Sequence, residues 1–215
     1  MLKLYDRRFG SSLRHDVLEN KPAPHTQASE AAFQAFIGAG TMPTFLDDLK
    51  KRNETQDIAV AAWQFLDEPH RTDEGRAKYE ATLWQDCIEH FECEAKAYDR
   101  LADLQGKLIL RMLAHVRLPV PTTNPPTVPQ EAACYFDVRG ILLERIDGYC
   151  LEDLTLGPLP SNLRKWHQII QSAADAAHEI ENRGVIMDDC AAQRSRGRAI
   201  QHAAHRRPGT VQLPG

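Results

Sequence analysis

The stretch that decides the fold is residues 84–101, WQDCIEHFECEAKAYDRL, where apolar residues recur at steps of three and four. These residues share one side of a helix: Trp84, Cys87, Ile88, Phe91, Ala95, Tyr98 and Leu101. The pattern is typical of an amphipathic helix whose apolar side is buried. It extends from about Glu74 to Gln105, and Gly106 stands where a glycine commonly ends a helix. We therefore predict one long helix over residues 74–105.

Strand candidates lie on both sides of this helix. Leu2 and Leu4 alternate with polar residues, which indicates a short strand within residues 1–9. Residues 108–118, 132–137 and 140–146 are apolar enough for further strands, and Ile141–Leu143 for one buried on both faces. Residues 119–129 hold too many prolines for a helix or central strand and predict a loop. An α+β fold is expected.

Two other regions complete the chain. Residues 10–73 contain short helical pieces, such as Ser29–Ile37 and Asp57–Leu66, divided by prolines, and we interpret them as an insertion or a peripheral helical layer. Residues 163–180 repeat apolar side chains at helical steps. Ser161 or Asn162 is the expected N-cap of this second helix, and Gly184 its end.

Composition gives no reason to expect several classes of partner. With 215 residues, 42% hydrophobic residues and a net charge of −4, the chain suits one core or two small lobes. Nucleic acid and membranes are not expected as partners, and no secretory signal is visible, so a cytoplasmic protein is expected, with a nuclear location as the alternative. The five cysteines lack metal-ligand spacing, which favours buried, reduced thiols and no metal site.

Two motifs on the predicted strand and helix resemble parts of a protein kinase. Met1–Leu4 is similar to the strand whose lysine, here Lys3, holds the α- and β-phosphates of ATP. Residues 94–101 resemble the helix whose glutamate pairs with that lysine. Glu94 lies three and four residues from Phe91 and Tyr98, so it can face inward, whereas Glu92 is expected to be solvated.

Two later motifs continue the resemblance. Residues 141–148 resemble the buried strand and hinge behind the adenine ring, with Leu143 as gatekeeper and the backbone of Glu144 to Ile146 bonding the base. Residues 178–190 resemble the helix end and the start of the catalytic loop. There Asp189, or in second place Asp188, would orient the substrate hydroxyl.

The order of these motifs is similar to that in divergent kinase-like proteins of filamentous fungi. The resemblance implies a kinase-like fold with a small antiparallel-sheet N-lobe in residues 1–146, including the helical insertion at 10–73, and the start of an incomplete helical C-lobe in 147–190. The implied ligands are ATP and Mg²⁺. The implied nucleotide-binding positions are Lys3, Glu94, Leu143, Glu144 and Ile146, and the implied catalytic position is Asp189.

The match stops after Cys190. The kinase pattern calls next for an asparagine and a metal-binding aspartate, but residues 191–215 contain no acidic residue, five arginines and two histidines. One hypothesis is a disordered basic tail. The other is a frameshifted or mis-spliced tail, because codons for residues 191–194 and 205–211, read one nucleotide later, can encode Pro-Pro-Asn-Val and Ile-Val-Asp-Leu-Ala-Gln-Cys. The nucleotide sequence of the locus and transcript decides between them.

The expected function follows from these matches. The chain begins at the lysine strand, without the glycine-rich loop, and lacks both metal-binding positions, so we expect an ATP-dependent phosphotransferase ancestry but negligible activity for this polypeptide. The alternatives are a pseudokinase or interaction module with an unknown protein partner, and an α/β adaptor with a basic nucleic-acid-binding tail. The apolar stripe of residues 163–180 is expected to be partly bare.

Overall fold

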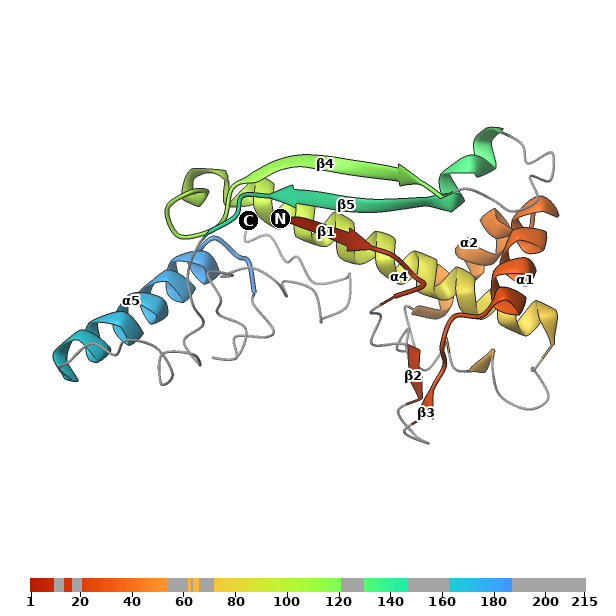
Figure 1. The fold of residues 1–215 in the computed structure, drawn as a ribbon, viewed down its shortest axis with the longest axis horizontal. Helices are drawn as coiled ribbons and strands as arrows, with labels where there is room; N and C mark the ends of the chain where they lie inside the picture. Colours follow the sequence, from red (N-terminus) through yellow and green to blue (C-terminus); the bar gives the residue numbers. More distant parts are fainter. Residues whose placement is uncertain are drawn as a thin grey trace. The chain divides into compact units, whose positions relative to one another are not determined.

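The computed structural model describes residues 1–9, 14–16, 21–53, 62, 64–65, 72–120, 130–146 and 163–186, which form a mixed α+β structure (Figure 1). The chain divides into two compact units, and each is described by itself. Unit 1 takes the described residues of Met1–Lys3, His90–Val116 and Ile141–Gly215. Unit 2 takes those of Leu4–Glu89 and Arg117–Gly140.

One antiparallel sheet of three strands has the order β1-β5-β4 (Figure 1). The strands are β1 (Leu2–Tyr5), β4 (Met112–Pro119) and β5 (Asp137–Leu143). Met1 and Leu143 exchange backbone hydrogen bonds of 2.5 and 2.8 Å, which sets the register of β1 on β5. The strand predicted in residues 1–9 is confirmed, and β5 is the central strand with edge strands on both sides.

The long helix of the sequence analysis is α4 (Asp73–Arg100). It ends five residues before the predicted Gln105, and a short 3₁₀ helix, η2 (Ala102–Leu104), follows it. Gly106 has a φ of 74°, a left-handed conformation that favours glycine. The predicted apolar side is buried at Phe91, Ala95, Tyr98 and Leu101, all with exposed fractions of 7% or less.

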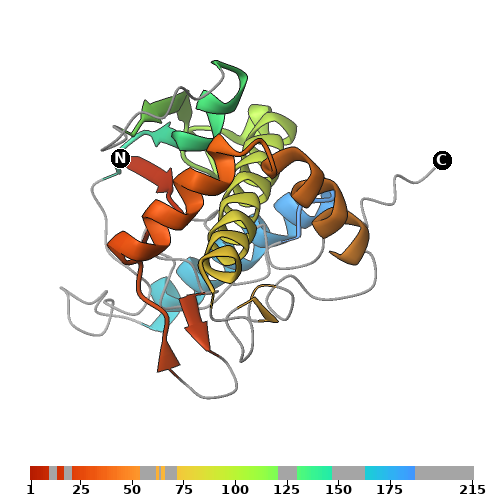
Figure 2. The same cartoon turned by 90° about the vertical axis from the view of Figure 1, so that its right-hand side faces the viewer.

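Unit 2 has its own core, built where α1 (Gln27–Gly38) and α2 (Met42–Asn53) meet α4. Figure 2 shows α1 beside α4. Thr26 and Ser29 form a capping box at the start of α1. The helix predicted over Ser29–Ile37 lies entirely within α1. Phe33, Ile37 and Met42 are at most 1% exposed and pack with Ala81 of α4. The region interpreted as a peripheral layer thus supplies core side chains. β2 (His15–Asp16) pairs with β3 (Lys21–Pro22) in a separate ribbon.

The strand predicted over Ala132–Asp137 is wrong. Residues Gln130–Phe136 form a 3₁₀ helix, η3, and the strand begins only at Asp137. Ala132, Tyr135 and Phe136 all pack against the core cluster of Phe33 and Ile37. Their spacing of three and four residues suits a helical turn, which places all three on one side.

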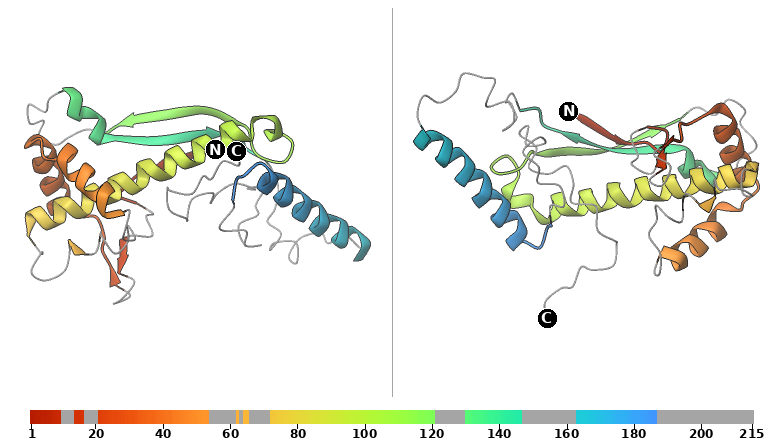
Figure 3. Two further views of the ribbon diagram at one scale, coloured as in Figure 1. Left: turned by 180° about the vertical axis from the view of Figure 1, so that it is seen from behind. Right: turned by 90° about the horizontal axis from the view of Figure 1, so that it is seen from below.

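The second predicted helix is α5 (Leu163–Asn182), and its C-terminal end belongs to unit 1. Arg183 bonds Asp103, just after α4, at 2.7 Å, and Figure 3 shows the last turn of α5 at the end of α4. Ile180 is fully buried, whereas Ile170 is 59% exposed. The described part of the apolar side of α5 is therefore partly bare, as expected.

The described cysteines are not disulfide-bonded. Cys87 is buried, Cys134 is half-buried and Cys93 is exposed, so the expectation of buried thiols is wrong for Cys93. Cys150 and Cys190 lie outside the described residues. None of the described helices combines the length and the apolar composition that a membrane span requires.

Candidate functional site

The structure brings Lys3 and Glu94 together as an ion pair within unit 1. Because Met1 is opposite Leu143 in the antiparallel sheet, Lys3 is opposite Ile141, on the same face of the sheet. Ile141 and Leu143 are at most 1% exposed, so this is the covered face. The lysine side chain is 24% exposed and the Glu94 side chain 4%.

In a half-buried strand the apolar side chains usually face the core and the polar side chains face solvent. Strand β1 has the opposite arrangement. Leu2 and Leu4 point away from the covered face and are 49% and 42% exposed, while the lysine between them points inward. A carboxylate buried as deeply as Glu94 requires a cation nearby, because an unpaired buried charge is costly. The buried Glu94 carboxylate needs a nearby cation, which Lys3 supplies from the covered face. This explains why the apolar side chains of β1 lie on the exposed face.

Glu94 holds its position because it lies on the buried side of α4. Phe91 and Tyr98, three residues before and four after it, are 7% and 0% exposed. Glu92 directly follows Phe91 and lies outside this buried side of the helix. Its side chain is 56% exposed and pairs with Lys96 at 3.7 Å. The expected difference between the two glutamates is confirmed, since helical spacing alone separates them.

The expected hinge follows β5 directly. The Glu144 N–H donates to the carbonyl of Arg111 at 2.9 Å, and the Glu144 carboxylate accepts from the Arg111 N–H at 2.9 Å. Within the segment Glu144–Ile146, the Glu144 N–H is thus engaged by the chain itself. The side chain of Ile146 is 54% exposed. The Glu144 N–H is therefore not available to bond a base, so such a bond would have to come from another group of this segment.

Tyr98 is the second polar side chain buried beside Glu94. It is fully buried, and its hydroxyl has no hydrogen-bond partner among the described residues. Burial, together with the negative charges of Glu94 and Glu144, raises the pKa of the Tyr98 hydroxyl, so it is protonated at neutral pH. Sequence reasoning used Tyr98 only as a core residue.

The catalytic aspartate is expected from the sequence a few residues after α5. Asp188 and Asp189 lie outside the described residues, as does the whole tail of residues 191–215. Within the part of the chain that the structure describes, no group of three His, Cys, Asp or Glu side chains could hold a metal ion.

A buried ionic cluster in unit 2, formed by Arg7, Arg14, Glu30 and Glu80, was not predicted. Arg7 pairs with both glutamates, at 2.5 Å for Glu30, and Arg14 bonds Glu80 at 2.6 Å. Glu80 is fully buried. A signal existed, because Glu80 lies four residues before Trp84 and so falls on the buried side of α4. The arginines carry no such signal, since Arg7 lies in a turn and Arg14 lies in a short 3₁₀ segment with no apolar periodicity around it.

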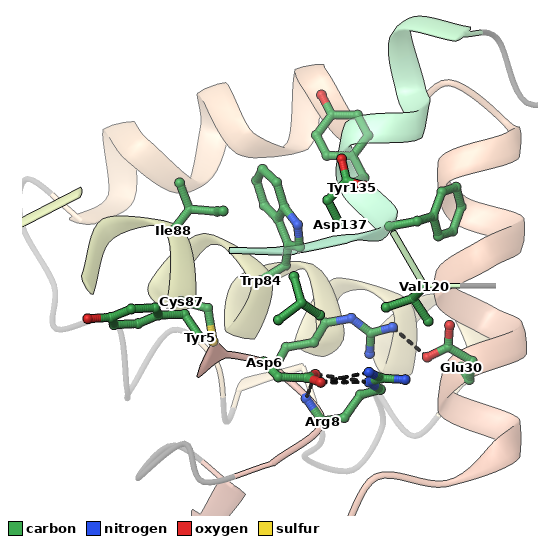
Figure 4. Close-up of a pocket in the computed structure, with 13 residues that line it drawn as sticks. Tyr5, Asp6, Arg8, Glu30, Trp84, Cys87, Ile88, Val120, Tyr135 and Asp137 are labelled. Carbon is green, nitrogen blue, oxygen red and sulfur yellow. Dashed lines mark hydrogen bonds and ion pairs between the residues drawn. The ribbon is translucent and has the colours of Figure 1, made fainter. Parts of the chain in front are cut away.

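A small cavity of about 30 Å³ lies beside this cluster (Figure 4). Asp6 and Arg8 form a two-pronged ion pair on its wall, and the buried Trp84 N–H has no partner among the described residues. Burial and the charges of Asp86 and Asp6 raise the pKa of the Cys87 thiol to about 12, so it is not a nucleophile at neutral pH.

The volume decides what this cavity can hold. It has room for about two water molecules, whereas small-molecule sites occupy hundreds of Å³. Neither Lys3 nor Glu94 lines it. None of the described residues that the sequence analysis assigned to a nucleotide site lines this cavity. No protein-family model, curated protein or solved structure matches the chain.

Proposed function

We propose that this chain is a protein-kinase-like domain that binds ATP, with the Lys3 ammonium contacting its phosphates. The observation that carries the proposal is the ion pair between Lys3 of β1 and Glu94 of α4. It is supported by the sheet order β1-β5-β4, which sets the lysine strand beside the strand that leads into the expected hinge.

The pair suits phosphate binding because it fixes a cation in place. A lysine on a free surface loses side-chain entropy when it binds, and most exposed ion pairs contribute little. Lys3 is held by a carboxylate that is 4% exposed, while about a quarter of its own side chain remains accessible. A pre-positioned charge of this kind is what phosphoryl-group recognition requires.

The remaining roles follow from the same proposal. Leu143, which is 1% exposed, would close the inner end of the base site, and backbone groups of Glu144 to Ile146 other than the Glu144 N–H would contact the base. Asp189 would orient the hydroxyl that accepts the phosphoryl group. The proposal includes negligible phosphoryl transfer by this polypeptide, because residues 191–215 contain neither the asparagine nor the aspartate that the kinase pattern uses to hold Mg²⁺.

The test measures ATP binding by calorimetry and by thermal stabilisation. The wild type should bind, and Lys3→Met should lose at least about tenfold in affinity, because one charge-assisted contact to phosphate is removed. Lys96→Met is the matched control, since Lys96 lies on α4, is 78% exposed and should leave binding unchanged. The double variant Lys3→Met/Glu94→Gln removes both charges and shows whether an unpaired carboxylate alone impairs folding.

Two outcomes contradict the proposal. A wild-type chain that folds but does not bind ATP removes the nucleotide role. Phosphate release from ATP above that of a Lys3→Ala variant removes the claim of negligible transfer.

A binding module without catalysis is the second candidate. Ile170 on α5 and Leu2 and Leu4 on β1 are large apolar side chains that are 42–59% exposed, and a partner protein would cover them in this case. A folded chain that associates with other proteins but does not bind ATP would favour this candidate.

A further inference from the structure

The Tyr98 hydroxyl is a buried polar group without a visible use. Tyr98 is fully buried on α4, and no described residue accepts or donates a hydrogen bond at its oxygen. Burying a hydroxyl without a partner destabilises a protein, and buried polar groups in folded proteins are almost always bonded. Phenylalanine would fill nearly the same space without this cost, so the hydroxyl needs an explanation.

Its place on the helix indicates the group that it can reach. Tyr98 follows Glu94 by four residues, and both side chains are on the buried side of α4, at 0% and 3% exposure. Long side chains on a helix lean toward its N-terminus, over the preceding turn. The phenol ring therefore extends toward the turn that carries Glu94. The pKa of the hydroxyl is raised by burial first and next by the charge of Glu94, which is consistent with their proximity.

We propose that the Tyr98 hydroxyl donates a hydrogen bond to the Glu94 carboxylate only when ATP is bound. This bond forms when ATP draws the Lys3 ammonium toward its phosphates. This inference rests on the proposed function and adds a positioning residue to it. When the lysine is shared with phosphate, the ion pair between the buried Glu94 carboxylate and Lys3 weakens, and the carboxylate gains a neutral donor. Tyr98 thereby stabilises the ATP-bound arrangement and not the free one.

The experiment compares Tyr98→Phe with the wild type in two measurements. Thermal unfolding without ATP should show the variant to be as stable as the wild type or more stable, because an unbonded hydroxyl is removed. Calorimetry should show ATP binding weakened by about five- to tenfold, which corresponds to one hydrogen bond to a charged group. Tyr79→Phe is the matched control, a buried tyrosine of α4 in unit 2, and should leave ATP affinity unchanged.

A double-mutant cycle with Glu94→Gln shows whether Tyr98 acts through Glu94. The effect of Tyr98→Phe on ATP affinity should shrink in the Glu94→Gln background, which a merely structural effect of the ring would not do. Full retention of ATP affinity by Tyr98→Phe overturns the inference, as does a clear loss of stability without ATP. If the folded wild type does not bind ATP at all, the proposed function fails and this inference fails with it.

Discussion

Three of the four buried carboxylates among the described residues have a cationic partner that can be named. Glu80 contacts Arg7 and Arg14, Glu94 contacts Lys3, and Asp137 contacts Arg117. Such pairs add little net stability over an apolar replacement, but removing one partner leaves a buried charge and costs several kcal/mol. Single substitutions at these positions are therefore expected to destabilise more than the pairs themselves contribute.

The first prediction concerns Glu30. Burial raises the pKa of its carboxyl. The charge of Arg7 and hydrogen bonds from Gln34, Arg7 and His25 lower the pKa by more than burial raises it, so the net value is about 2. Because the folded-state pKa is below that of the unfolded chain, the stabilisation is present above about pH 4.5 and is lost as the pH falls toward 2. Glu30→Gln should destabilise the protein at neutral pH by roughly 2 kcal/mol, allowing for partial exposure.

Urea unfolding of the wild type and of Glu30→Gln between pH 7 and pH 2 tests this. The stability difference should be largest at pH 7 and should close toward pH 2. Glu92→Gln is the control, since Glu92 is a 56% exposed carboxylate with a 3.7 Å pair to Lys96. A constant difference across this range would show that Glu30 does not titrate with the folded pKa given above.

The candidate site was predictable where helical spacing separates neighbouring residues. Glu94 could be preferred over Glu92 because only Glu94 shares the side of Phe91 and Tyr98. The partners of Glu80 could not be found in this way. Arg7 and Arg14 are separated from Glu80 by more than 60 residues of sequence, and no periodicity connects them with it.

At the scale of the element, the end of α5 shows how a single glycine sets a boundary. The Val185 N–H bonds the Ile180 carbonyl at 3.4 Å, and the Gly184 N–H bonds the Glu181 carbonyl at 2.7 Å. This is a Schellman motif, and the two apolar residues that such a motif brings together, Ile180 and Val185, are both buried. Gly184 takes a φ of 70° to make the turn.

The second prediction is that Gly184→Ala lowers the free energy of unfolding by about 1 kcal/mol or slightly more, because alanine disfavours a positive φ. Its Cβ would also lie 2.8 Å from a guanidinium nitrogen of Arg100, which has to move. Gly40→Ala is the matched control, with a φ of 71° and no atom within 4 Å of the added carbon. Thermal and urea unfolding should show both losses, and a Gly184→Ala variant as stable as the wild type would contradict the assignment.

The error at η3 has a physical cause. Residues 132–136 are apolar and include the aromatic pair Tyr135 and Phe136, which suits a strand by propensity. The spacing of Ala132, Tyr135 and Phe136 suits one side of a helical turn, and their contacts with the Phe33 cluster favour that conformation. Tertiary packing therefore outweighs propensity in this short segment.

At the scale of the molecule, the sequence predicted the α+β class and the long helix, because both follow from hydrophobic periodicity. It did not predict that residues 27–53 help to form a core with α4, since the short pieces between prolines gave no sign of what they pack against. Phe33, Ile37 and Met42 are nevertheless at most 1% exposed. Long-range packing of this kind is not encoded in local pattern.

The third prediction concerns α5, whose Ile170 is 59% exposed. An exposed apolar side chain on a helix favours self-association. Ile170→Lys should reduce concentration-dependent light scattering and leave the unfolding temperature within about 2 °C of the wild type. Ile180→Ala, at a fully buried position of the same helix, should instead destabilise by about 2–4 kcal/mol. Unchanged scattering for Ile170→Lys would contradict this prediction.

The pairing of β1 with β5 has a consequence for synthesis of the chain. Met1 and Leu143 are separated by 142 positions in sequence. At the usual 5–20 residues per second, the ribosome completes the partner strand roughly 7–28 s after the first residues are made. Closing so long a loop also slows folding relative to local helix formation. Throughout that interval the backbone N–H and C=O groups of the newly made β1 have no β5 to pair with, so they stay bonded to water until the sheet forms.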